Sequence, residues 1–387
     1  MQSRRIRAYG WRLGLVATIV GGLVLGPVVF AGAAEAPWWP VKVNSYFGKY
    51  DAGQKKAGKP SQSLQGPSVE AWAPPAKADK PYTIGVSFPH LKDPYWLAVD
   101  YGIVKEAERL GVGIQLVAAG GYTELQKQVD QVENLSQQKV DGIILASISY
   151  AALDPLVNEI VKKGMPVLEV INDIQAPAIQ AKALVSFFDM GFKAGEFVVA
   201  DAAGKSEVNV VFFPGPAGSG WAPDTVDGFN EAVKQFPGKV NTLAVKWGDT
   251  GKNVQLNLIE DALQTFPEID YLIGNAVAAD AAVGPLAESQ RADSVKVVST
   301  YIIPPLYDKI KAGQVAAAPS DLTVIQGRMA VDMMVRILNG EKPGKDFPFR
   351  AGPIIPTITQ ANIDQYPYEV LFGDRSFRPQ FKVKPKM

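Results

Sequence analysis

The sequence predicts an α/β protein with two doubly wound parallel-sheet lobes joined by a multi-strand hinge. From residue 82 onward, short apolar runs alternate with amphipathic helical segments, a pattern typical of parallel sheets with right-handed crossovers. The alternation forms two series of similar size, which indicates two lobes. Segments near Phe187, Tyr301 and Ser320 lie where the chain would pass between the lobes. Crossings of this kind form a hinge, with the ligand site in the cleft.

The first series opens with the apolar run 82–86, which is expected to be a buried strand, and continues with a helix over 97–110. Asp93 is a favourable N-cap and Pro94 a favourable first residue for that helix. Leu125 and Leu135 mark one apolar face of the next helix. The other elements expected in this series are strands over 114–117, 142–146, 166–170 and 183–186 and a helix over 153–163.

The second series begins with a helix over 190–203 and a very apolar strand over 208–213. A loop rich in Gly and Pro follows that strand and is interpreted as a flexible turn at the cleft. The helices expected after it cover 225–236, 254–265, 276–287 and 324–339, with short elements at 305–312 and 315–317. The strands expected after it cover 243–246, 271–273 and 295–298.

Two segments precede the alternating core. Residues 1–33 have the features of an export signal peptide: a basic start, an apolar run over 13–30 and the small residues Ala31-Gly32-Ala33. An uncleaved anchor is the alternative, since the run is long enough to span a bilayer. Residues 34–80 form an N-terminal extension whose islands 38–43 and 69–72 are expected to pair as a hairpin, with a mobile loop over 48–67.

The same pattern divides the core into lobes. The N-terminal lobe is expected to comprise residues 81–186 plus 300–320, and the C-terminal lobe residues 187–299 plus 321–387. The length of the chain agrees with about two domains.

Composition restricts the chemistry and the partners. The chain has 39 basic and 39 acidic residues, and loss of the four signal arginines would leave a net charge of −4. That balance argues against nucleic acid or an anionic membrane as a partner. There is no cysteine, and His90 is the single histidine. The sequence also lacks the G-x-S-x-G motif that would supply a nucleophilic serine for that histidine to activate. We therefore expect an exported protein with no membrane insertion after signal cleavage, no metal and no catalytic function.

Aromatic residues gather where a ligand site is expected. Tyr95 and Trp96 lie on the first helical turn after a strand, at the sheet edge where open α/β proteins bind ligands. Tyr122 and Tyr301 also follow predicted strands. These rings favour a small ligand held by aromatic faces. The alternative interpretation is that one of the first two rings packs on the neighbouring helix.

Five local motifs follow one another along the chain: Leu91-Lys92-Asp93-x-Tyr95-Trp96, Ala119-Gly120-Gly121-Tyr122, Phe213-Pro214-Gly215-Pro216, Gly274-x-Ala276-x-Ala278-Ala279 and Ser320-Asp321-x-x-x-x-Gln326-Gly327. The layout of the alternating core resembles the type I periplasmic binding proteins, the family of the ribose binders. The five motifs are closer to a sensory branch of that family, whose members bind trimethylamine N-oxide and dock on the periplasmic domain of a sensor histidine kinase. The resemblance therefore implies a periplasmic, non-enzymatic receptor with a small-molecule ligand and no cofactor.

The resemblance also implies particular site residues. Aromatic faces attract a methylated cationic nitrogen by roughly 0.5 to 2 kcal/mol per ring, depending on desolvation. Tyrosine hydroxyls are expected to donate to the oxide oxygen, and Asp321 to orient them or to face the nitrogen. Phe187 aligns where the family is expected to have tryptophan, and phenylalanine binds cations more weakly. Trp221, in the loop rich in Gly and Pro, is expected to compensate from the second lobe.

Two other function classes stay open. A sugar-binding component of an ABC importer would stack a sugar between aromatic rings and bind its hydroxyls through Asp, Asn and Arg, but the expected cleft loops contain little arginine. An enzyme is the third class, and the presence of a single histidine together with the absence of cysteine argues against it.

Overall fold

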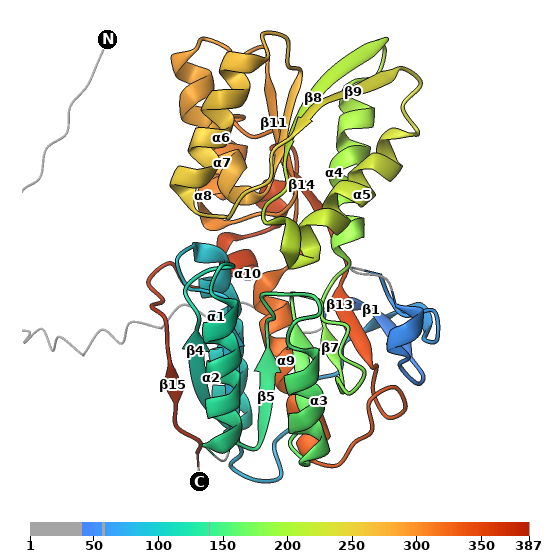
Figure 1. Cartoon of the computed structure of the whole chain (residues 1–387), viewed down its shortest axis with the longest axis vertical. Helices are drawn as coiled ribbons and strands as arrows, with labels where there is room; N and C mark the ends of the chain where they lie inside the picture. The colour runs from blue at the N-terminus through green and yellow to red at the C-terminus, as the bar shows by residue number, and fades with distance from the viewer. Residues whose placement is uncertain (1–40, 56–58, 139, 387) are drawn as a thin grey trace, which may run out of the picture. The chain divides into compact units, whose positions relative to one another are not determined.

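The computed structural model describes residues 41–55, 59–138 and 140–386 (Figure 1). The described residues form one compact unit. The predicted signal peptide at 1–33 and residues 38–40 of the predicted island at 38–43 lie outside the described residues. Among the described residues, no helix is both long and apolar enough to cross a bilayer.

The first lobe is built on a nine-stranded sheet. Helix α1 (Pro94–Leu110) packs against α9 (Thr323–Leu338), and α2 (Leu125–Gln137) packs against α3 (Asp154–Lys162). In sheet order, the strands are β15 (Lys382–Val383), β4 (Gly113–Ala118), β3 (Thr83–Phe88), β5 (Gly142–Leu145), β6 (Val167–Val170), β7 (Lys182–Ala183), β13 (Arg350–Pro353), β1 (Lys42–Phe47) and β2 (Gln65–Ala71). Its helices are α1, α2, α3 and α9, with the 3-10 turn η1 (Ala52–Gln54) in the extension.

The second lobe is built on a six-stranded sheet, with α4 and α5 on one side and α6, α7 and α8 on the other (Figure 1). In sheet order, the strands are β14 (Thr357–Thr359), β12 (Ala317–Pro319), β11 (Lys296–Ser299), β10 (Tyr271–Gly274), β8 (Glu207–Phe213) and β9 (Lys239–Val245). The helices are α4 (Phe187–Asp201), α5 (Trp221–Val233), α6 (Lys252–Thr265), α7 (Ala276–Glu288) and α8 (Pro304–Lys311), with turns η2 (Ala217–Ser219) and η3 (Ile363–Gln365) and the short helix α10 (Tyr368–Phe372) after the second sheet.

Local sequence signals set the helix ends that matter for the site. The Asp93 carboxylate accepts a hydrogen bond from the Tyr95 backbone N–H at 3.0 Å, and Pro94 occupies the first turn of α1, as predicted. Ser186 caps α4 in the same way, so that helix begins at Phe187 rather than at the predicted 190. Helix α5 begins at Trp221, four residues before the predicted start. The aromatic rings of Phe187 and Trp221 therefore both lie on the first turn of their helices.

The chain crosses between the lobes at 184–187, 320–323 and 353–357, and it returns from β14 of the second sheet to β15 of the first sheet over 360–381. The crossings expected near Phe187 and Ser320 agree with this arrangement, whereas the one expected near Tyr301 is wrong, because Tyr301 lies between β11 and α8 of the second lobe. Gln326 links two crossings: its Oε1 accepts from the Val185 N–H at 3.1 Å, and its Nε2 donates to the Asp321 carbonyl at 2.7 Å.

The expected division of the C-terminal half between the lobes is wrong. Residues 300–320 carry α8 and β12, and β12 pairs with β11 in the second sheet. Residues 321–387 belong largely to the first lobe, because β13 pairs with β7 and β15 pairs with β4. Only β14 returns to the second sheet, antiparallel to β12. These pairings join segments far apart in the chain, which periodicity does not reveal.

The N-terminal extension adds an antiparallel hairpin to the first sheet, as expected. Strand β1 pairs with β2 and with β13, so the hairpin extends the sheet at the end that carries β13. The loop between its strands packs on the lobe rather than standing free: Leu64 joins the core cluster that contains Ile143, Leu145 and Phe349.

Candidate functional site

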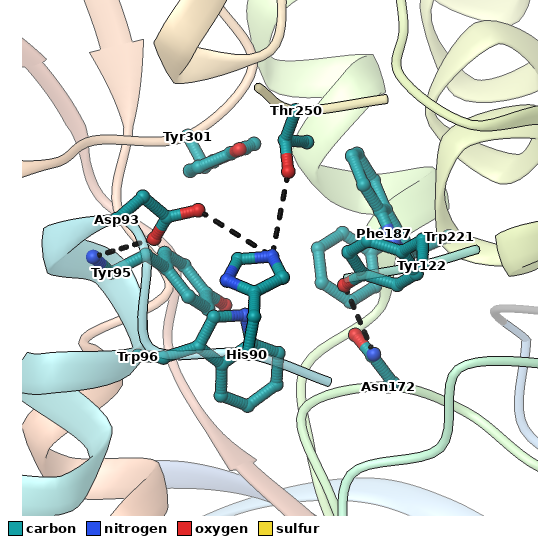
Figure 2. A pocket seen from close by; sticks show the side chains of 10 residues that line it. All are labelled: His90, Asp93, Tyr95, Trp96, Tyr122, Asn172, Phe187, Trp221, Thr250 and Tyr301. Atoms are coloured by element: carbon teal, nitrogen blue, oxygen red, sulfur yellow. Dashed lines mark hydrogen bonds and ion pairs between the residues drawn. The ribbon is translucent and has the colours of Figure 1, made fainter. Parts of the chain in front are cut away.

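One cavity lies where the two lobes meet, and residues of both lobes line it (Figure 2). The first lobe contributes His90, Asp93, Tyr95, Trp96, Tyr122 and Asn172, and the second contributes Phe187, Trp221, Thr250 and Tyr301. Nearly all of these residues follow the carboxyl end of a strand directly or open the next helix. Parallel strands place such segments at one sheet edge, where α/β proteins bind ligands. The lobes close tightly on this lining, because the free space inside the cavity is only about 20 Å³, room for about one water molecule.

Aromatic rings from the two lobes meet across this cavity. The Trp221 ring centroid lies 6.1 Å from that of Tyr122, 5.9 Å from that of Phe187 and 6.0 Å from that of Tyr301. Tyr95 and Tyr301 form an edge-to-face pair at 5.2 Å between centroids. Such spacings are those of interacting rings, and they leave several ring faces directed at one small volume (Figure 2).

Polar groups orient two of the tyrosines. The Tyr95 hydroxyl donates to Oδ2 of Asp321 at 2.5 Å, so Asp321 lies behind the ring rather than on the cavity surface. Asn172 Nδ2 donates to the Tyr122 hydroxyl oxygen at 3.1 Å. The Tyr122 O–H therefore keeps its own proton available to donate into the cavity.

His90 lies at the seam between the lobes. Its Nε2 is 3.5 Å from the Thr250 hydroxyl of the second lobe and 3.7 Å from Oδ2 of Asp93. Its Nδ1 has no hydrogen-bond partner among the described residues. Near the same seam, Lys92 Nζ and Asp249 Oδ2 form a 2.6 Å ion pair between the lobes. The structure thus represents the closed arrangement, in which the cavity has walls from both lobes.

Burial shifts the ionisation of the cavity groups. Desolvation raises the pKa of Asp93 to about 6, although the backbone N–H groups of Tyr95 and Trp96 favour its charged form. Desolvation also raises the pKa of Asp321 to about 6, against the Tyr95 hydrogen bond, which lowers it. It lowers the pKa of His90 to about 4, with Lys92 acting in the same direction. Near pH 7 the carboxylates are therefore largely ionised and the imidazole is neutral, which favours a cationic or positively polarised ligand.

Six of the seven residues expected at the site line this cavity: Tyr95, Trp96, Tyr122, Phe187, Trp221 and Tyr301. Asp321 contacts it only through Tyr95. Sequence reasoning did not place His90 or Thr250 at the site. It treated Asp93 only as a helix cap. The cap geometry is correct, but the same carboxylate also borders the cavity.

The described part of the chain contains no group of three or more His, Asp or Glu side chains arranged to hold a metal ion. The cavity lining instead combines aromatic rings with a few hydrogen-bonding groups, which is the composition of a small-molecule binding site.

Residues 84–342 match the family model described as a periplasmic binding protein domain. The chain belongs to the periplasmic binding protein family. It is 33% identical over 308 residues to the periplasmic protein TorT of Escherichia coli K12, a match that covers 79% of this chain and 86% of TorT. Both findings agree with the predicted family and with a periplasmic location.

Two solved structures extend the comparison. This periplasmic binding protein is 41% identical, with a TM-score of 0.75, to an ABC transporter solute-binding protein from Bradyrhizobium sp. BTAi1 with bound Bis-Tris, over 89% of this chain and 98% of that one. It is 29% identical, with a TM-score of 0.69, to a chain of the TorS sensor domain–TorT complex in the presence of TMAO, over 78% of this chain and 99% of that one. The fold class predicted from the sequence is confirmed.

Proposed function

We propose that this periplasmic binding protein binds trimethylamine N-oxide, or a closely related methylated amine, in the interlobe cavity, and that it signals occupancy to the periplasmic domain of a sensor histidine kinase. The protein acts as a receptor, without catalysis and without a cofactor. The observation that carries the proposal is the convergence of ring faces from both lobes on one small, buried volume.

The cavity suits the two ends of this ligand. The methylated nitrogen bears positive charge, which ring faces and the buried Asp93 carboxylate attract. The oxide oxygen accepts hydrogen bonds, and the Tyr122 hydroxyl supplies a donor because Asn172 already satisfies one of its lone pairs. The Trp221 Nε1–H is a second donor that makes no hydrogen bond within the described residues.

The ligands of the similar structures support this chemistry. One structure of the TorS–TorT complex was solved in the presence of TMAO, and the Bradyrhizobium protein was solved with bound Bis-Tris, which is a tertiary amine. Both molecules carry a nitrogen with three carbon substituents. The partner proposed here follows from TorT, which forms a complex with the TorS sensor domain.

A solute-binding component of an ABC importer is the second candidate, because the Bradyrhizobium relative is described as an ABC transporter protein. For a sugar, the cavity would need charged and amide groups that bind several hydroxyls. Asp93 and Asn172 qualify, but no arginine lines the cavity in the described part of the chain. An importer of an amine would use the same cavity as the proposed sensor, and only the protein partner separates these two functions.

The decisive experiment is isothermal titration calorimetry with trimethylamine N-oxide, trimethylamine, glycine betaine, choline, Bis-Tris and ribose. We expect heat with the N-oxide or another methylated amine and none with ribose. Titrating the kinase sensor domain into the loaded protein should give tighter binding than into the ligand-free protein. Binding of ribose alone would favour the importer, and loss of ligand to a chemical product during long incubation would contradict a non-enzymatic role.

Trp221→Leu tests the aromatic contribution, with Trp247→Leu as the matched control. Trp221 is 4% exposed in the cavity, whereas Trp247 is 39% exposed outside its lining. Loss of one cation–π partner should weaken amine binding by about tenfold, corresponding to roughly 1 to 2 kcal/mol. The control should bind as the wild type does. Equal affinities for all three proteins would refute the aromatic site.

A further inference from the structure

A buried cluster of charges lies behind the cavity, where the N-terminal extension packs on the first lobe. Lys182 Nζ donates to Glu169 Oε2 at 2.9 Å and to Asp173 Oδ1 at 2.8 Å. A second lysine, Lys55 of the extension, forms an ion pair with the other carboxylate oxygen of Asp173. The Lys55 side chain is 0% exposed, although the residue belongs to a loop. Burying an ammonium is unfavourable unless it is paired, so this contact is a specific feature of the fold.

The Lys55–Asp173 ion pair supports one wall of the cavity, because Asp173 directly follows Asn172, which lines the cavity. Ile171, at the start of this turn, has φ 66°, a left-handed conformation that is costly for a β-branched residue. The turn must therefore be held from outside, and the two lysines hold it through Asp173. Asn172 in turn donates to the Tyr122 hydroxyl oxygen at 3.1 Å inside the cavity.

The Lys55 ammonium also contacts Tyr150, whose side chain packs against the second-lobe wall of the cavity. Lys55 Nζ donates to the Tyr150 hydroxyl at 3.1 Å and lies 4.6 Å from the ring centroid. The Tyr150 side chain packs on Gly220 of the second lobe, where an added Cβ would lie 3.2 Å from Tyr150 Cβ. Gly220 has φ 78° and immediately precedes Trp221. Lys55 therefore supports two walls of the cavity, the first-lobe wall at Asn172 and the second-lobe wall at Trp221.

We propose that Lys55 is a positioning residue for the ligand site, and that the N-terminal extension thereby forms part of the binding machinery. Through Asp173 it fixes the orientation of Asn172, and through Tyr150 it fixes the seam beside Trp221. The identity of the ligand used to test this role rests on the proposed function, but the role itself does not.

The first test compares trimethylamine N-oxide binding by wild type, Lys55→Met, Lys55→Arg and Lys49→Met in calorimetry. Lys49 is an exposed lysine of the same extension and is the matched control. Lys55→Met should weaken binding about tenfold, the change expected when one hydrogen-bonded support of a site is lost. Lys55→Arg should restore most of the affinity, since it keeps the charge, and Lys49→Met should leave it unchanged.

The second test needs no ligand. Amide hydrogen exchange should become faster in segments 171–175 and 220–224 of Lys55→Met, and should be unchanged there in Lys49→Met. Tyr150→Phe, a milder variant that keeps the ring, should speed exchange in 220–224 alone. Wild-type exchange in both segments of Lys55→Met, or wild-type affinity in that variant, would overturn the proposal. If the wild type binds no methylated amine, the proposed ligand is wrong, and the exchange test still decides the role of Lys55.

Discussion

Tyr95→Phe isolates the hydrogen bond between a cavity tyrosine and the buried carboxylate at the hinge. The variant keeps the ring, which packs edge-to-face on Tyr301, and removes only the hydroxyl that donates to Asp321 at 2.5 Å. Asp321 is 0% exposed, and the remaining side-chain donor to the same oxygen is Gln326 Nε2 at 3.1 Å. The change therefore leaves a buried carboxylate with one donor fewer.

The cost should depend on pH. The pKa of Asp321 is about 6 in the folded protein, above the unfolded value of about 3.9, so the folded state binds its proton more tightly. The stability that this group contributes is fully present below the unfolded pKa and is lost as pH rises through about 6. Removing the Tyr95 donor raises the folded pKa further. The variant should lose about 1 kcal/mol at pH 5, as for a neutral hydrogen bond, and about 2 to 3 kcal/mol at pH 8, as for a charged one.

Urea unfolding at pH 5 and pH 8 measures this difference directly. Tyr307→Phe is the control, because Tyr307 and Tyr95 are both 7% exposed and Tyr307 lies outside the cavity lining. The control should show the same loss at both pH values. In an Asp321→Asn background, Tyr95→Phe should lose its pH dependence. An equal loss for Tyr95→Phe at both pH values in the wild-type background would refute the assignment of the charge to Asp321.

Two further predictions concern helix α1 of the first lobe, away from the site. A Cβ at Gly102 of α1 would lie 2.1 Å from the Val324 carbonyl oxygen of α9, so Gly102→Ala should destabilise the protein by about 3 kcal/mol in thermal melts. Burial raises the pKa of Asp100 to about 7, and its carboxylate accepts from the Gln380 N–H at 2.8 Å. This raised pKa costs stability as pH rises from about 4 through 7. Asp100→Asn should therefore be more stable than the wild type by about 3 kcal/mol at pH 8 and by a smaller amount at pH 5. Identical differences in stability at the two pH values would contradict the burial argument.

Much of the fold was predictable because its signals are local. Continuous apolar runs such as 208–213 identify buried parallel strands, and Asp93 and Pro94 identify the start of α1. The lobe assignment of α9 and β13 was not predictable in this way. It depends on β13 pairing with β7, a strand of two residues that contains the buried Lys182. A lysine in a core strand is accommodated only by the carboxylates folded around it, and a sequence does not show those partners.

The site was predictable to the extent that aromatic residues follow strand ends. Thr250 was not, because it follows β9 in a polar loop and borders the cavity only when the lobes meet. Asn172 and Asp173 were equally ambiguous, since such residues are common in turns. What distinguishes them is the left-handed Ile171 before them and Lys55 from a distant segment, and both are properties of the tertiary structure.

The division of rings between the lobes explains how a small ligand can control closure. A ligand shifts a conformational equilibrium only by its differential affinity for the two states. In the open state it would retain the first-lobe rings, and closure adds Phe187, Trp221 and Tyr301. At about 1 kcal/mol for each added ring, closure gains about 3 kcal/mol, a shift of roughly 100-fold. The exposed ion pair between Lys92 and Asp249 also joins the lobes, but such pairs contribute about 0.5 kcal/mol and need no ligand. Ligand-dependent closure should therefore depend on the second-lobe rings and not on this ion pair.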